Sequence, residues 1–573
     1  MPVDCRENIL SEEYYDVILD FPMWVLGSSA EGLCHTDIGS DYTIVYFPIN
    51  LLMDAEDYFF SYRSVPKIYG LMQEGGSIGG FDPNSLIDSG ITQIQREPLA
   101  LTGRGVVICV IDTGIDYTSP VFRNEDGSSR ILAIWDQTIQ TGNPPEGFQY
   151  GTEYTREDIN RALQSEDPYS VVPSRDEIGH GSALASAAAG SKLNGGFSFQ
   201  GAAPDADIVV VKLKQCKQYL RQFYLVPGSV PAYQENDIML AVQYVDSFVD
   251  TFSRPVVICL GLGTNYGDHT GSSPLGRYLN SIAVKRSRAV VVAGGNEGSA
   301  GHHFQGQLAS PASGGTNVAA VEVRVVDGAE GFFLELWGSL PDVYTVSVRT
   351  PGGERIRPIR LGINDAITYS FIYERSRVTI AGFLVEPASG EELVVMRVQD
   401  PTPGIWTFQV EAAADIHNGE FNMWLPITQF LSAPVYFLEP SPYITLTEPS
   451  LASNVICVST YDATNDSFYI NSGRGYSRCG TIRPDLAAPG VNVSTLNGRE
   501  SNSSLAAAIT TGAVAQFMQW AVVEQNNGVV ESQEIKSYLI RGASRSIDMT
   551  YPNREWGYGR LNMVGTFDAL IGV

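Results

Sequence analysis

The sequence predicts an α/β protein built on a parallel, doubly wound sheet, preceded by a small α+β segment and interrupted by an inserted β-sandwich. Three observations lead to this prediction. From Gly105 onward, continuous apolar runs alternate with helical stretches, as buried parallel strands and their crossover helices do. Short strand signals separated by Gly and Pro turns fill residues 316–442. The α/β pattern then resumes, so we interpret the sandwich as an insertion.

Residues 1–80 are expected to form a unit of their own. Residues 14–21 and 42–48 alternate as strands, and residues 51–63 have helical apolar spacing. A glycine-rich stretch over 74–81 follows and favours a flexible connection. The domain boundaries predicted from the sequence are therefore 1–80, 81–315, 316–442 and 443–573.

The main sheet and the insert differ in the length and spacing of their strands. The main sheet is predicted to contain strands at 106–111, 208–213, 255–260, 289–293 and 455–458, with helices at 235–251 and 279–288. About eight antiparallel strands, of jelly-roll type, are predicted in the insert at 321–326, 332–336, 344–348, 367–373, 378–384, 393–398, 406–410 and 421–425.

Charge and hydropathy exclude several functional classes. The net charge of -27 argues against nucleic acid or an anionic membrane surface as a partner. We find no run of eighteen apolar residues, so no transmembrane helix is expected. The first twenty residues lack the pattern of a secretory signal. We therefore expect a chain made in the cytoplasm without a Sec-type leader.

The cysteines and histidines predict neither a disulfide framework nor a metal centre. The seven cysteines are odd in number, scattered, and contain no CxxC pair. His302 and His303 are adjacent, and adjacent residues rarely reach one ion; no carboxylate pair accompanies them. No cofactor is expected.

Four polar residues stand where an acyl-transfer site needs them. Ser504 opens an Ala-rich helical run, where unpaired backbone N–H groups favour an anion. Asp112 ends a buried strand, His180 lies between two glycines before a small-residue helix, and Asn296 ends another strand on a glycine turn. Taken singly, each also has a purely structural explanation: a helix cap, a structural histidine, or a turn-forming asparagine.

Their order along the chain, Asp, His, Asn, Ser, resembles that of the subtilisin-like serine proteases (subtilases, the S8 family). The resemblance covers roughly residues 100–310 and 445–570. It implies a catalytic triad of Asp112, His180 and Ser504, with Asn296 stabilising the oxyanion. It also implies substrate-binding residues on an edge strand and in the wall of the S1 pocket, namely Gly261, Leu262, Gly263, Ala293, Gly294 and Gly295.

Further features most resemble the clostridial Csp-type spore germination proteases. These are the N-terminal segment without a signal peptide, residues 112–117, 263–267 and 295–303, and the insert before the serine helix. The resemblance implies that residues 1–80 are a pro-segment that is cut by the enzyme itself, near 79–82, and stays bound non-covalently. It also implies a protein substrate, a cortex-lytic pro-enzyme activated by limited proteolysis during germination, and a spore-associated location.

One departure from the family leaves the activity open. Asn502-Ser503-Ser504 stands where family members usually carry Gly-Thr-Ser. Asn tolerates positive φ better than most residues, and Ser503 keeps a hydroxyl. An active protease and an inactive pseudoprotease that acts as a germination scaffold are both compatible with this sequence. A housekeeping intracellular subtilase is a third possibility.

Overall fold

The computed structural model describes residues 4–22, 33–51, 62, 64–73, 84–193, 199–310, 315–359 and 365–571. The helix expected over 51–63 lies outside these residues except for Leu51 and Tyr62. The glycine-rich connection over 74–81 and the expected cut near 79–82 lie wholly outside them.

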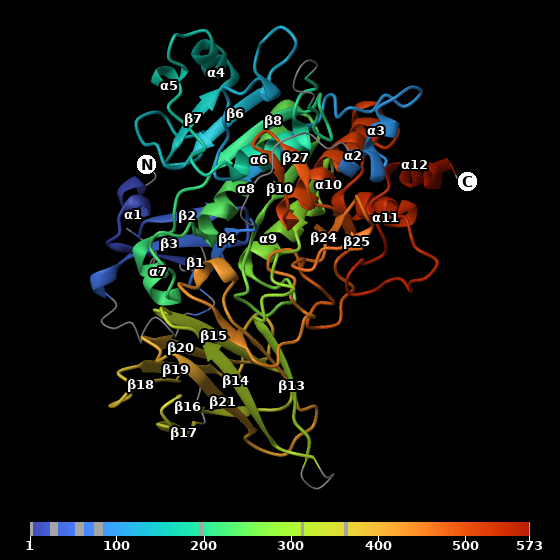
Figure 1. The fold of residues 1–573 in the computed structure, drawn as a ribbon. Helices are drawn as coiled ribbons and strands as arrows, with labels where there is room; N and C mark the ends of the chain where they lie inside the picture. The colour runs from blue at the N-terminus through green and yellow to red at the C-terminus, as the bar shows by residue number, and fades with distance from the viewer. Residues whose placement is uncertain are drawn as a thin grey trace.

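The predicted parallel sheet is confirmed and forms the centre of the molecule (Figure 1). Its strand order is β25-β24-β12-β10-β5-β8-β6-β7, with β26 paired to β24. Only the outer pairs β24/β25 and β6/β7 are antiparallel. The strands are β5 (Val107–Asp112), β6 (Ile131–Asp136), β7 (Thr152–Thr155), β8 (Asp207–Lys212), β10 (Val256–Leu260), β12 (Arg288–Ala293), β24 (Ile456–Asp462), β25 (Ser467–Phe468) and β26 (Leu486–Pro489).

Two helices of small residues pack closely against this sheet. They are α6 (His180–Ala189) and α10 (Ser503–Met518), and every residue of both is buried. A Cβ on Gly512 would lie 2.3 Å from the Ala202 Cβ, so α10 needs glycine there. Within the described residues one helical stretch, Ser503–Val523, is long and apolar enough to cross a membrane, but 83% of its apolar window is buried in the core.

The other helices surround the sheet. The helix predicted at 235–251 is α8 (Glu235–Phe252). The boundary predicted at 279–288 is wrong: α9 runs over Pro274–Ala283, because the Ser273 side chain caps it and Pro274 opens it. The remaining helices are α1 (Arg6–Leu10), α2 (Asn84–Asp88), α3 (Ile91–Ile94), α4 (Arg156–Leu163), α5 (Pro168–Val171), α7 (Gln218–Tyr224), α11 (Ser532–Gly542) and α12 (Met563–Ile571).

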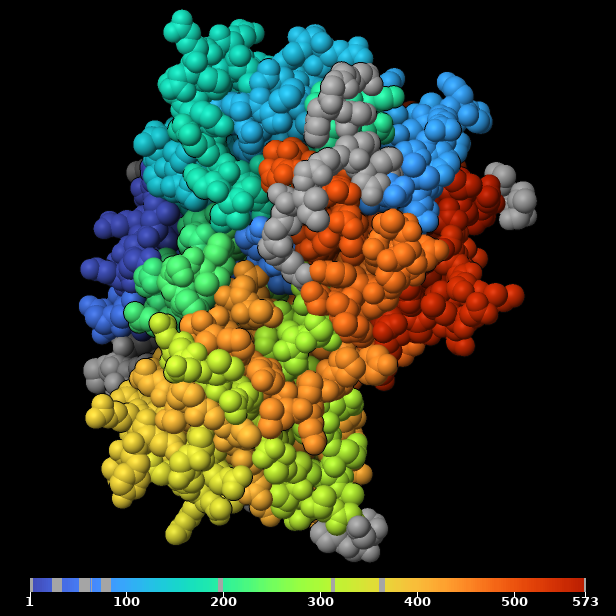
Figure 2. Space-filling model, in the orientation of Figure 1, coloured from blue at the N-terminus to red at the C-terminus, as the bar shows by residue number. Residues whose placement is uncertain are grey.

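The insert is a sandwich of two antiparallel sheets, β13-β22-β15-β20-β19-β18 and β17-β16-β21-β14-β23, which projects from the α/β body at the bottom of Figures 1 and 2. Apolar side chains from both sheets form a separate core. The sequence did not predict β13, β17 and β23. The strands are β13 (His303–Gln307), β14 (Val318–Val325), β15 (Gly331–Gly338), β16 (Tyr344–Arg349), β17 (Arg355–Ile359), β18 (Asp365–Ser370), β19 (Arg377–Phe383), β20 (Glu392–Gln399), β21 (Gly404–Ala412), β22 (Glu420–Trp424) and β23 (Val435–Phe437).

The N-terminal segment forms a three-stranded antiparallel sheet, β1-β3-β2, from β1 (Tyr14–Leu19), β2 (His35–Ile38) and β3 (Tyr42–Pro48). Its apolar side chains join the core beneath α8. The structure places a disulfide between Cys5 and Cys34. Two of the seven cysteines therefore form one disulfide, and the other five are free thiols. The sequence predicted no disulfide framework and did not indicate this single link.

A buried charge pair joins the segment to the body of the protein. Asp16 is fully buried, and one of its carboxylate oxygens lies 2.6 Å from Lys217 Nζ. The other accepts hydrogen bonds from the side-chain amides of Gln234, at 2.5 Å, and Asn236, at 3.3 Å. Lys217 also donates to the carbonyls of Asn8 and Tyr14. The segment thus contributes the buried Asp16 carboxylate, and the body contributes the three side chains that bind it.

Replacing Asp16 with Ala should destabilise the protein by about 3–5 kcal/mol, because a buried Lys217 charge would lose its partner. Denaturant unfolding monitored by fluorescence measures this change. The matched control is Asp41→Ala, since Asp41 is exposed and accepts a hydrogen bond from the neighbouring Ser40. Equal unfolding midpoints for the two variants would show that the buried pair does not hold the segment.

Candidate active site

Asp112 and His180 meet at the carboxyl end of the parallel sheet. Asp112 is the last residue of β5, and its Oδ1 lies 2.8 Å from His180 Nδ1 and also accepts the backbone N–H of Thr113. His180 opens α6 after Gly179, whose φ of 87° is a left-handed conformation that favours glycine. A Cβ on Gly181 would lie 2.3 Å from the Gly114 carbonyl oxygen, so α6 can approach β5 only with glycine there.

Ser504 lies on the other side of the histidine, 324 residues further along the chain. Its Oγ is 3.1 Å from His180 Nε2, and both side chains are buried. Asn502 caps α10, since its side-chain oxygen accepts the Leu505 N–H at 2.9 Å. Its φ of -173° is extended backbone. The tolerance for positive φ that the sequence suggested for Asn502 is therefore not needed.

The N-terminus of α10 holds the Asn296 side chain in place. Its Oδ1 accepts the Ser503 N–H at 2.9 Å, which fixes the amide orientation. Its Nδ2 is buried and has no hydrogen-bond partner among the described residues. Leaving a buried donor unpaired costs free energy in the resting protein. Such a donor can stabilise negative charge that develops beside it during a reaction.

Of the predicted substrate-binding residues, Gly261 lies beside Ser504, and Gly263 and Gly295 lie beside Thr447. Leu262 and Gly263 form the short strand β11 (Leu262–Gly263), and Gly261 precedes it. A Cβ on Gly261 would lie 3.0 Å from Ser504 Oγ and 3.1 Å from His180 Cε1, so a larger residue would press on both side chains. Ala293 ends β12, and Gly294 and Gly295 continue from it.

A strand of the N-terminal segment lies along β11. β4 (Ile68–Leu71) lies between β11 and β9 (Tyr233–Gln234) and pairs antiparallel with both. The Met72 N–H donates to the Gly261 carbonyl at 2.9 Å, continuing the ladder. This arrangement is β-augmentation, the way an extended peptide binds a sheet edge.

The strand delivers the Met72 carbonyl to the serine. The Met72 carbonyl oxygen lies 2.9 Å from Ser504 Oγ. The Met72 sulfur is 3.9 Å from Thr447 Oγ1 and packs beside Gly263. A cavity of about 490 Å³ adjoins the next residue, Gln73, and is also lined by Asn296. Sequence reasoning missed both Met72 and Thr447, because neither belongs to a recognisable motif.

The charge of Asp112 determines the protonation of His180. Burial lowers the pKa of His180, but the charge of Asp112 and its hydrogen bond, together with Asp176 and Glu500, outweigh burial and raise the pKa above its ordinary value. His269 is equally buried, and there burial dominates and lowers the pKa to about 4. The hydrogen bond between Ser504 Oγ and His180 Nε2 offers a path for proton transfer from the serine to the histidine. The described residues contain no cluster of three metal-ligating side chains.

The chain matches the model of a known protein family over more than half of its length. The model of the Peptidase S8 subtilase family matches residues 103–326 and 442–559. The chain belongs to the subtilase family. It is a subtilisin-like serine protease by family, and its fold is the α/β subtilase fold with an inserted β domain.

Among solved structures, the CspB protease of Clostridium perfringens is similar over 86% of this chain and 100% of its own, with 28% identity and a TM-score of 0.75. The protease MycP1 with its N-terminal propeptide removed (14% identity, 85% of this chain and 96% of that chain, TM-score 0.37) and the PatG macrocyclase in complex with peptide (11%, 87% and 100%, 0.40) are more distant. No curated protein sequence matches the chain.

The His180 pKa should be measurable by NMR of histidine-labelled protein, with His269 as an internal reference. We expect a His180 value above about 6.5 and a lower value in Asp112→Asn, where burial acts without the opposing charge. The neutral imidazole is the form that can accept the serine proton, so reactivity of Ser504 should fall as the pH drops through the raised pKa. An unchanged His180 pKa in Asp112→Asn would contradict this electrostatic account.

Proposed function

We propose that this protein is an active serine endopeptidase that uses Asp112, His180 and Ser504 to cut its own chain between Met72 and Gln73. The observation that carries the proposal is the position of the Met72 carbonyl oxygen, 2.9 Å from a serine Oγ that itself lies 3.1 Å from a histidine nitrogen. The linker near 79–82 was the site expected from the sequence. We favour Met72 because, of the described residues, it is the one paired to Gly261 as a substrate would be.

In this mechanism Ser504 Oγ attacks the Met72 carbonyl carbon while His180 Nε2 takes the serine proton. The Asn296 amide and the Ser504 N–H stabilise the negative oxygen that forms. His180 then gives the proton to the leaving Gln73 nitrogen, and water releases Met72 from the serine by the same route. Asp112 keeps Nδ1 protonated throughout and stabilises the imidazolium.

After the cut, we propose that residues 1–72 stay bound as a non-covalent pro-segment. The buried Asp16–Lys217 pair and the two-sided pairing of β4 support this proposal. The resemblance to Csp-type proteases, with the similarity to the CspB protease, supports a spore-associated role in which the enzyme activates a cortex-lytic pro-enzyme by limited proteolysis.

Intact-mass analysis of the purified protein tests the role of Ser504. The wild type should yield two fragments, whereas Ser504→Ala should remain full length because no nucleophile is left. Ser501→Ala is the matched control: this nearby hydroxyl accepts the Asn492 N–H and has no part in the proposed chemistry, so the variant should be cut. An uncut wild type, or a cut Ser504→Ala, would refute self-processing by this residue.

Asn296→Ala should slow self-processing by about 10²–10³-fold, the loss found when the corresponding donor is removed from a subtilisin, which is itself a member of this family. Pulse–chase of newly synthesised chain measures the rate constant. Asn497→Ala is a suitable control, since this exposed amide bonds to the Gly179 carbonyl and lies outside the proposed oxyanion site. Equal rates for the two variants would exclude Asn296 as an oxyanion donor.

A further inference from the structure

The insert reaches the bound strand β4 through the connection between β22 and β23. This connection includes the short 3₁₀ helix η6 (Thr428–Phe430), which follows Ile427. The side-chain amide of Gln429 donates a hydrogen bond to the carbonyl of Leu71, the last residue of β4. The insert therefore contacts the strand backbone directly beside the proposed cut.

Gly70 is the third residue before the proposed cut, and the insert leaves it no room for a side chain. A Cβ on Gly70 would lie 2.5 Å from Ile427 Cδ1 and 2.7 Å from both Cδ and Nε2 of Gln429, whereas real Cβ atoms stay at least 3.0 Å from such neighbours. The φ of Gly70 lies outside the left-handed region. The need for glycine thus comes from these two side chains, which we call the insert wall.

The insert wall is held in place by contacts of its own. Ile427 is 1% exposed and belongs to the main core. The Gln429 amide would lose its hydrogen bond to Leu71 by turning away. Between them, the Thr428 N–H donates to Glu297 Oε1 at 3.0 Å. Making room for a side chain would therefore disturb a buried residue and break hydrogen bonds.

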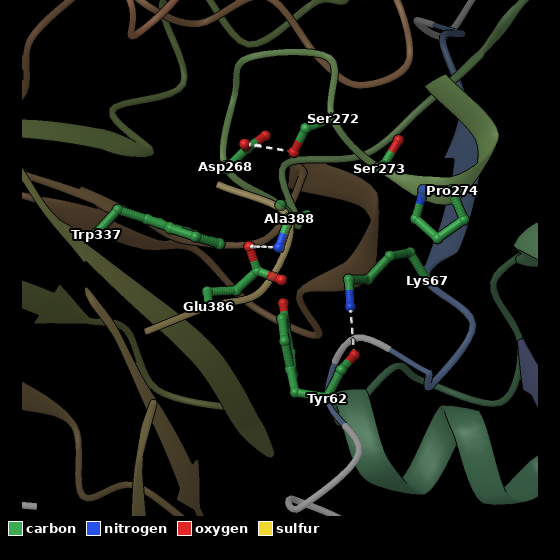
Figure 3. Close-up of a pocket in the computed structure, with 10 residues that line it drawn as sticks. Tyr62, Lys67, Asp268, Ser272, Ser273, Pro274, Trp337, Glu386 and Ala388 are labelled. Atoms are coloured by element: carbon green, nitrogen blue, oxygen red, sulfur yellow. Dashed lines mark hydrogen bonds between the residues drawn. The ribbon is translucent and has the colours of Figure 1, made fainter. Parts of the chain in front are cut away.

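A second contact docks the insert on the same N-terminal segment. The buried Tyr62 donates its hydroxyl proton to Glu335 Oε1, and its ring stacks on Phe333 with the centroids 6.5 Å apart. Figure 3 shows Tyr62 in a pocket with Trp337 and Glu386, which also belong to the insert. The insert thus contacts the segment ahead of β4 as well as along it, which limits how far the insert wall can move away.

We propose that the insert determines the specificity of the protease: the insert wall admits only glycine at the third residue before the cut. This deepens the proposed function and rests on it, because β4 must be bound as a substrate. The class of substrate recognised is an extended protein segment with glycine two residues ahead of the one whose carbonyl is attacked. Any larger residue at that position would meet Ile427 and Gln429.

Self-processing of the full chain, measured by pulse–chase in cell-free translation, tests this proposal. Gly70→Ala should slow processing at least about tenfold, because overpacking a fixed contact weakens binding of the strand. The matched control is Gly228→Ala, since a Cβ on Gly228 would have no neighbour within 4 Å. The control chain should be processed at the wild-type rate.

Trimming the insert wall should restore processing of the Gly70→Ala chain. Ile427→Val removes the Cδ1 methyl group, and Gln429→Ala removes the amide. In this doubly trimmed background, chains with Ala and with Gly at position 70 should be processed at rates within about threefold of each other, as a double-mutant cycle requires of a direct contact. A general defect of folding, or of β4 itself, would not be repaired by these two changes.

An uncut wild type would refute the proposed function and this inference with it. If the wild type is cut, equal rates for Gly70→Ala and Gly228→Ala would overturn the specificity proposal alone. The same holds if the Gly70→Ala chain stays slow, or insoluble, in the trimmed background, because the defect would then lie outside the insert wall.

Discussion

The close packing of α6 and α10 against the parallel sheet is the constraint on which the site depends. His180 is the first residue of α6 and Ser504 the second of α10. Their side chains meet at 3.1 Å only because the helices lie this deep. Glycine and alanine make that depth possible, since a Cβ at Gly181 or Gly512 would lie within 2.3 Å of a neighbour. The backbone therefore positions the proposed nucleophile and base, which is the preorganisation that catalysis needs.

The small sheet β11-β4-β9 explains how the N-terminal segment is attached to the rest of the protein. β9 and β11 are two-residue strands on either side of β4, and a peptide backbone between them satisfies the hydrogen-bonding groups of both. β4 supplies that backbone from within the chain. The Met72 side chain, which follows β4, packs beside Gly263 and Thr447. Tyr69 of β4 is buried in an apolar cluster that includes Leu262. In this account, self-recognition and substrate recognition use one surface.

Much of the fold could be predicted from the sequence, because strand periodicity and small-residue helices are local signals. The five strands predicted for the main sheet lie within one residue of the observed ends, except that β24 runs four residues further. The sequence did not predict β6, β7, β25 and β26. The predicted α9 boundary was wrong because it followed the apolar pattern over 279–288. The helix instead begins at Pro274, where the Ser273 side chain caps it. Motif order brought together Asp112, His180, Asn296 and Ser504. Met72 and Thr447 reach the site through tertiary pairing that leaves no local pattern, so the sequence alone could not indicate them.

The new terminus created by self-processing tests the central claim most directly. Terminal-peptide mass spectrometry of the purified wild type identifies the first residue of the larger fragment and the last residue of the smaller one. Attack by Ser504 on the carbonyl that lies beside it predicts Gln73 and Met72, respectively. An intact chain, or termini at another bond, would contradict the account that β4 is bound as the substrate of this site.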